Sequence, residues 1–132
     1  MNTKELQTLI RSLKYGEKAL KACVDDCYLI LDMDCNEDTE LFNQLIDENK
    51  DKDHGWVSPE AYLQKYIPTF TWIGGERDYS DYVWRFLVDG KIYEIPGWYD
   101  SYNGRDCDDA TYFYRVEAAT KLVTYYKKVS DE

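Results

Sequence analysis

Apolar residues in the first part of the chain recur at intervals of three and four, which is the spacing of one helix face. The pattern begins at Leu6 and runs through Gly16 to Leu31, and Asn2 with Glu5 has the form of a capping box ahead of it. A glycine inside a helix costs about 1 kcal/mol relative to alanine, which a long helix can tolerate. We therefore predict one long amphipathic helix, with two helices meeting at Gly16 as the alternative.

Two more helices are expected before residue 67. One should begin near Asp38 and form an antiparallel hairpin with the first helix. The residues that it should bury there are Leu41, Phe42, Leu45 and Ile46. The other should begin at Ser58, because serine is a favoured N-cap and Pro59 suits the first helical position.

From Ile67 onward the chain is rich in aromatic and β-branched residues punctuated by glycine, which is typical of strands. Asp89 and Gly90 form a favoured two-residue turn and predict a hairpin of residues 82–88 and 91–95. The other expected strands, of which the last two should form a pair, are residues 69–73, 112–117 and 122–129.

Residues 96–110 lie between these strands and are predicted to be a loop of fifteen residues, a length that is often functional. The whole pattern predicts an α+β fold in a single domain, residues 1–132. Residues 1–66 should form a helical hairpin plus a short third helix, and residues 67–129 an antiparallel sheet of about five strands.

Composition agrees with an ordered chain, because 44% of the residues are hydrophobic and 16% are aromatic. With no secretory signal and no apolar run of 18 residues, we expect a cytoplasmic protein with no membrane contact. In that reducing compartment the cysteines should be free thiols, with Cys23 and Cys27 filling the core from one helix face. The four cysteines are Cys23, Cys27, Cys35 and Cys107.

The common catalytic templates are missing from the sequence. His54 is the only histidine, and no Gly-x-Ser-x-Gly, phosphate-binding loop or Cys-x-x-Cys pair occurs. We therefore expect neither catalytic residues nor a cofactor, and we predict a binding protein rather than an enzyme.

One segment resembles a calcium-binding loop, since acidic or amide residues alternate from Asp32 to Glu40. Glu37 stands where the sharp turn of such a loop needs glycine, and Asn43 where a glutamate closes the site. We therefore predict that these residues end one helix and cap the next, and that no metal binds.

Charge is the most informative feature of the sequence. Sixteen basic against 26 acidic residues give a formal net charge of −10, which disfavours direct nucleic-acid binding and attracts basic partners. Simple solubility is the alternative explanation. The first candidate partner surface combines aromatic and acidic residues of the predicted loop, namely Trp98, Tyr99, Asp100, Tyr102, Asp106, Asp108 and Asp109. The second is the acidic patch Asp32, Asp34, Glu37, Asp38 and Glu40.

Residues 97–104, Gly-Trp-Tyr-Asp-Ser-Tyr-Asn-Gly, resemble a Gly-x-Tyr-x-Ser-Tyr-x-Gly segment of small uncharacterised bacteriophage and prophage accessory proteins. The likeness covers about residues 83–128. Such proteins, when small and acidic, often look like inhibitors of bacterial defence, including anti-CRISPR and anti-restriction proteins. The resemblance implies a phage gene product in the bacterial cytosol, and it brings no catalytic residue with it.

Together these observations predict an inhibitor that covers a basic nucleic-acid-binding groove of a bacterial host protein, with carboxylates in place of phosphates. A module for a nucleotide signal is the alternative, with the aromatic residues 98–102 stacking a base and Arg77 and Arg105 meeting phosphate. An enzyme comes third. The long apolar helix stripe is compatible with a monomer or a homodimer.

Overall fold

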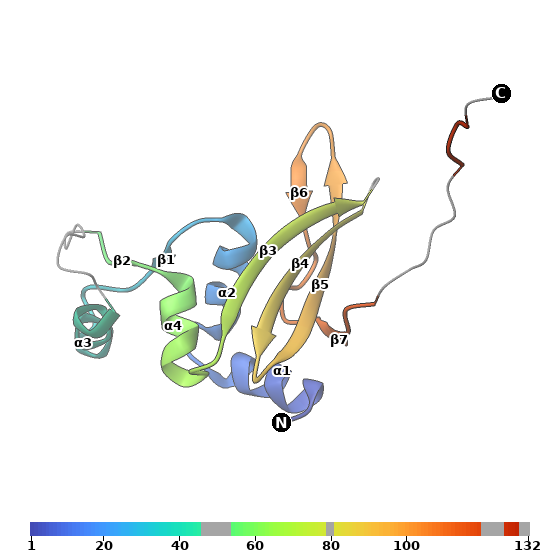
Figure 1. Cartoon of the computed structure of the whole chain (residues 1–132). Coiled ribbons are helices and arrows are strands. Elements are labelled where there is room, and N and C mark those ends of the chain that lie inside the picture. The colour runs from blue at the N-terminus through green and yellow to red at the C-terminus, as the bar shows by residue number, and fades with distance from the viewer. Residues whose placement is uncertain (46–53, 79–80, 120–125, 130–132) are drawn as a thin grey trace.

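The computed structural model describes residues 1–45, 54–78, 81–119 and 126–129. Its helices are α1 (Thr3–Ser12), α2 (Gly16–Asp25), α3 (Asn36–Leu45) and α4 (Pro59–Tyr66). Two short strands lie between the helices, β1 (Leu29–Ile30) and β2 (Trp56–Val57). The remaining strands follow α4, namely β3 (Thr71–Asp78), β4 (Asp81–Val88), β5 (Lys91–Asp100), β6 (Gly104–Asp106) and β7 (Tyr114–Val116). The predicted α+β class, with helices first and a five-stranded antiparallel sheet second, is confirmed (Figure 1).

The prediction of one long first helix is wrong, because the chain turns at residues 13–15 and a second helix begins at Gly16. The turn brings Gly16 so close to α1 that a Cβ atom there would lie 1.8 Å from the carbonyl oxygen of Ile10. Glycine is therefore required for this approach. The capping box is confirmed, with the Glu5 N–H donating to Asn2 Oδ1 at 2.8 Å.

The end of the predicted long helix is also corrected. Helix α2 stops at Asp26, whose backbone is left-handed, and the next residues form strand β1 instead of a further helical turn. Strand β1 pairs antiparallel with β2, with Leu29 opposite Val57 and Ile30 opposite Trp56. Leu29 and Val57 are buried while Ile30 and Trp56 are exposed, so this small ribbon has one inner and one outer face.

Helix α3 begins at Asn36, close to the predicted start, and buries Phe42. Helix α2 packs mainly against α4, whereas α3 lies beside β2, on the far side of α4 from the sheet (Figure 1). The predicted burial of Ile46 lies outside the described residues. The start of α4 is confirmed, since Ser58 Oγ accepts a hydrogen bond from the Ala61 N–H at 3.2 Å and Pro59 occupies the first turn.

The sheet is ordered β3-β4-β5-β6, and β7 also pairs with β5. The predicted hairpin of β4 and β5 is confirmed, and both turn residues, Asp89 and Gly90, have positive φ as a type I′ turn requires. The predicted loop at residues 96–110 is wrong in its first part. Strand β5 continues to Asp100, and β6 returns beside it with Trp98 opposite Asp106.

Within the described residues, the first strand of the predicted terminal pair has a partner that was not predicted. Residues 114–116 form β7 against β5, with Ile92 opposite Val116. Residues 126–129 contain no strand, and the preceding part of the predicted strand lies outside the described residues.

The core lies between one face of the sheet and helices α1, α2 and α4, and it extends past α4 to Phe42 of α3 and to the inner face of the β1–β2 ribbon. Its largest fully buried aromatic side chains are Trp84, Tyr62, Tyr93, Phe42, Phe70 and Phe86. Residues 107–113 connect β6 to β7 and close one edge of this core, because Cys107, Ala110 and Phe113 are buried. Their polar neighbours Asp108 and Asp109 consequently face outward. No helix in the described ranges is long and apolar enough to span a bilayer.

Candidate functional site

Three neighbouring hollows cross the surface in a row, which we call the groove. The middle hollow, of about 510 Å³, lies between α2, the segment before and within β1, and residues 108–110. It shares Ala22, Cys27 and Tyr28 with a second hollow of about 560 Å³ beside Trp72, which we call the Trp72 end of the groove. The middle hollow also shares Asp108 and Asp109 with a third hollow of about 320 Å³ beside Trp98, which we call the Trp98 end of the groove.

The Trp72 end combines aromatic walls with two carboxylates. Its aromatic residues are Tyr28 and Trp72, and its carboxylates are Asp26 at the end of α2 and Glu60 in the first turn of α4. Glu60 is held in place, because its Oε2 accepts a hydrogen bond from the Trp72 N–H at 3.1 Å and its Oε1 one from Gln64 at 3.2 Å.

Two thiols also line the Trp72 end. The prediction that both Cys23 and Cys27 fill the core holds only for Cys23, which is buried, whereas Cys27 lies beyond the helix end and is exposed. Burial, with a smaller contribution from the Glu60 carboxylate, raises the pKa of Cys23 to about 12. The Cys23 thiol therefore stays protonated at neutral pH and is a poor nucleophile.

The Trp98 end has the same combination of groups. Trp98 and Tyr112 are exposed to 40% and 68% and stand beside Pro96, Asp108 and Asp109. The Asp109 carboxylate accepts hydrogen bonds from the Thr111 N–H and hydroxyl at 2.9 and 2.7 Å, which lower its pKa. Asp108 is exposed and forms no hydrogen bond or ion pair with another described residue.

Lys21 neutralises part of the negative charge around the middle hollow. Its ammonium group bridges Asp25 at 2.7 Å and Asp106 at 2.5 Å, and this contact lowers the pKa of Asp106. Burial alone would lower the pKa of Lys21, but hydrogen bonds to the two carboxylates raise it instead. Lys21 thus joins α2 to the strand that leads into residues 107–113.

Exposed apolar side chains of the β1–β2 ribbon border the middle hollow. Tyr28, Ile30 and Trp56 are exposed to 49%, 62% and 42%, and the rings of Tyr28 and Trp56 stack 5.5 Å apart and nearly parallel. The His54 ring lies 4.9 Å from that of Trp56. Contiguous exposed aromatic surface of this kind marks binding sites on soluble proteins.

The first predicted partner surface is divided by the structure. Trp98, Asp108 and Asp109 line the groove, and Asp106 approaches it through Lys21. Three other members lie at the tip of the β5–β6 hairpin, and these are Tyr99, Asp100 and Tyr102.

At that tip the side chains are partly engaged with one another. Asp100 accepts hydrogen bonds from the Tyr102 N–H and from Asn103, and Tyr102 is 96% exposed. The Tyr99 ring is covered by the guanidinium of Arg77 at 3.7 Å, and Arg105 lies 5.2 Å from the Tyr82 ring. The tip is therefore an arginine–tyrosine cluster rather than an extension of the groove.

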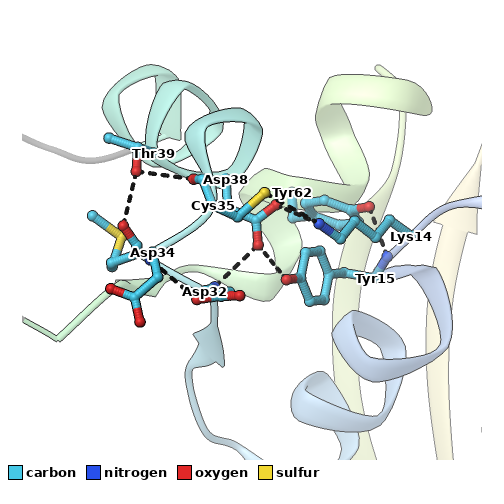
Figure 2. A network of polar contacts seen from close by, with 9 residues as sticks. Lys14, Tyr15, Asp32, Asp34, Cys35, Asp38, Thr39 and Tyr62 are labelled. Atoms are coloured by element: carbon cyan, nitrogen blue, oxygen red, sulfur yellow. Dashed lines mark hydrogen bonds and ion pairs between the residues drawn. The ribbon is translucent and has the colours of Figure 1, made fainter.

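The second predicted surface needs one correction, because Asp38 is only 1% exposed and cannot face a partner. Its carboxylate accepts hydrogen bonds from Lys14 at 2.8 Å, from the Tyr15 hydroxyl and from the Asp32 N–H at 3.0 Å (Figure 2). Burial alone would raise the pKa of Asp38, but these three donors together lower it.

The other members of that patch, Asp32, Asp34, Glu37 and Glu40, are exposed. The predicted capping role of Asp38 is also corrected. Its carboxylate accepts a hydrogen bond from the Asp32 N–H, which precedes α3, and not from an N–H group in the first turn of α3. In the ranges that the structure describes, no group of three His, Cys, Asp or Glu side chains is arranged to hold a metal ion.

Sequence reasoning missed most of the groove. The periodicity predicts Cys27, Ile30 and Leu31 on the apolar face of the first helix, so it does not anticipate the outward position of Ile30 or the strand that follows Tyr28. The alternation of outer and inner residues there was the available signal, but four residues are too few to distinguish a strand from a helix. Comparisons with known protein families, with curated proteins and with solved structures give no match to this chain.

Proposed function

We propose that this chain is a non-catalytic binding protein that docks on a basic surface of another protein through the groove. The observation that carries the proposal is the repeated combination of exposed aromatic side chains and carboxylates along the row of hollows. Interfaces typically have an aromatic centre and a polar rim, and their aromatic residues contribute most of the affinity. Carboxylates around such a centre attract a basic partner and align it.

The partner that fits this chemistry best is a nucleic-acid-binding protein of a bacterial defence system, inhibited because the groove occupies its basic surface. Two observations support this choice, the net charge of −10 and the resemblance of residues 97–104 to phage accessory proteins. In such a complex the groove carboxylates take the place of nucleic-acid phosphates.

An infection assay tests the proposal directly. The protein is expressed in bacteria that have an active CRISPR or restriction system, and the plating efficiency of a phage targeted by that system is measured. Wild type should restore plating and Tyr28→Ala should lose most of this effect. Tyr126→Ala should retain it, because Tyr126 is 96% exposed but is not among the residues that line the groove. Failure of wild type across a panel of defence systems, or equal loss in both variants, would overturn the proposal.

A second candidate, a nucleotide-binding module, is favoured by the arginine–tyrosine cluster at the hairpin tip. Arg105 forms no ion pair with another described residue and stacks near Tyr82, so its N–H groups can meet a phosphate. Titration with ATP, followed by the NMR signals of Tyr82 and Tyr99, distinguishes the candidates. Saturable shifts that disappear in Arg105→Ala would support the module, and their absence would leave protein docking.

A further inference from the structure

The two ends of the groove repeat one arrangement, although they are built from different segments. The Trp72 end has two aromatic residues, Tyr28 and Trp72, and two carboxylates, Asp26 and Glu60. The Trp98 end likewise has Trp98 and Tyr112 with Asp108 and Asp109. Asp109 also lies 4.0 Å from the Arg11 guanidinium, so Asp108 is the carboxylate of this end that has no ion pair with a described residue. No lysine, arginine or histidine is among the described residues that line either end.

This arrangement is selective for a cation. The face of an aromatic ring attracts a positive charge within about 6 Å of its centre, and a carboxylate completes the site with charge-assisted hydrogen bonds. An anion would be repelled by the paired carboxylates, and a neutral donor would gain no Coulomb attraction and only weaker hydrogen bonds to them. A guanidinium group suits such a site better than an ammonium group, because it stacks flat on a ring and binds a carboxylate with two N–H groups.

The middle of the groove differs from its ends in both charge and apolarity. Lys18 and Lys21 line it, and Lys21 already neutralises two carboxylates, so a further cation gains little there. The exposed side chains of Tyr28 and Ile30 offer apolar contact instead. The order of groups along the groove is therefore cation-binding, apolar, cation-binding.

We propose that the two ends of the groove are twin pockets, each of which takes one arginine side chain of a basic segment of the partner protein, with an apolar residue of that segment between them. The identity of the partner rests on the function proposed above, whereas cation binding by each pocket is a property of this chain alone. The two can therefore be tested separately.

The pockets can be tested with n-butylguanidinium, the end of an arginine side chain, against its uncharged isostere n-butylurea. The indole N–H signals of Trp72 and Trp98 report on the two pockets independently in NMR titrations of the full chain. We expect saturable shifts of both signals with the guanidinium at millimolar concentration and no saturation with the urea. Equal binding of the urea, or no selective shift of either signal, would overturn the proposal.

Single charge removals then assign the carboxylates. Glu60→Gln should weaken guanidinium binding about fivefold at Trp72 and leave Trp98 unchanged, and Asp108→Asn should do the reverse. The side-chain oxygen of the glutamine can still accept the hydrogen bond from the backbone N–H of Trp72, so the fold should persist. Glu37→Gln removes the same charge from an exposed position on α3 and is the control. Equal weakening by all three variants would mean general attraction to an acidic surface and would overturn the twin pockets.

The same variants separate failure of the pockets from failure of the proposed function. If the guanidinium binds as expected but the chain relieves no defence system, the pockets stand and the inhibitor role is wrong. The opposite result is that the chain restores phage plating, Tyr28→Ala loses this effect, and neither indole signal responds to the guanidinium. In that case docking through the groove is supported and the twin-pocket proposal is wrong.

Discussion

The two acid-rich segments of the chain, residues 32–40 and 100–109, use their carboxylates differently. In the first segment the central carboxylate, Asp38, is buried and receives three hydrogen bonds from other parts of the fold. In the second segment the carboxylates are all exposed. Asp106 contacts Lys21 and the Cys107 N–H, and Asp109 contacts Thr111 and, at 4.0 Å, Arg11. The comparison shows that a run of acidic residues can serve folding at one position and remain available for a partner at the next.

The cause of this difference is the environment that each segment reaches. Residues 32–38 lie against the turn between α1 and α2, where Lys14 and Tyr15 place a cation and a hydroxyl beside Asp38 (Figure 2). Residues 107–113 instead follow strand β6, where Cys107, Ala110, Thr111 and Phe113 are buried and the two aspartates face solvent. A carboxylate that the fold itself does not use, such as Asp108, can be changed with the least cost to stability.

The largest effect is expected from Asp38→Ala, which should lower the free energy of unfolding by about 3 kcal/mol. The substitution leaves the buried Tyr15 hydroxyl and the Asp32 N–H without their acceptor. Urea denaturation measures the change. Glu37→Gln, an exposed neighbour, is the control and should change the value by no more than about 0.5 kcal/mol. Similar losses in both variants would contradict the structural role of Asp38.

A second prediction concerns the loss of stability at acidic pH. Because the pKa of Asp38 is lowered in the folded chain, its stabilising contribution is complete above the unfolded value of about 3.9 and is lost as pH falls through the folded value. Asp106 and Asp109 act with the same sign. The free energy of unfolding should therefore fall between pH 5 and pH 2.

The variants again separate the two segments in this measurement. Asp38→Asn should start from a lower stability and show a shallower fall with acid, because the contribution of the Asp38 carboxylate is gone. Asp108→Asn should keep the wild-type slope. Parallel curves for wild type and Asp38→Asn would show that Asp38 does not account for the acid sensitivity.

The sequence predicted those features of the fold that depend on local chemistry. The Ser58–Pro59 helix start, the Asn2 capping box and the Asp89–Gly90 turn are all present, because each is determined by a few adjacent residues. The single first helix was wrong because periodicity alone does not report a close approach such as that of Gly16 to Ile10. Strand β5 was cut short at Pro96 because the partner strand β6 could not be foreseen from its three residues.

The candidate site was predictable only in part, for a similar reason. Trp98, Asp108 and Asp109 are among the candidates predicted from the sequence, and the structure brings them together in one hollow. Glu60 and Trp72 come from α4 and β3, and only the packing of α4 beside the sheet joins them to Tyr28. Asp38 was misassigned because charge in a sequence does not report burial.

A smaller effect is expected from Lys21→Met, which removes the cation that joins the second acidic segment to α2. Since the three side chains are each more than a third exposed, solvent screens the pair, and the free energy of unfolding should fall by about 1 kcal/mol or less. Thermal unfolding of Lys18→Met, which removes an equal charge from the same hollow, is the control. A larger loss for Lys18→Met would show that Lys21 is not the stabilising contact.

The smallest effect on stability, and the sharpest test of the comparison, is expected from Asp108→Asn. Asp108 has no contact of its own with the described fold, so the free energy of unfolding should stay within about 0.5 kcal/mol of wild type. Adding Asp106→Asn and Asp109→Asn should lower it by about 1 kcal/mol or more, because those carboxylates hold Lys21 and Thr111. Urea denaturation of both variants measures this difference. If carboxylates of the groove steer a basic partner, the single variant alone should slow association, with a reduced dependence of the rate on salt. A stability loss in Asp108→Asn equal to that of the triple variant would mean that this segment, like residues 32–40, serves the fold throughout.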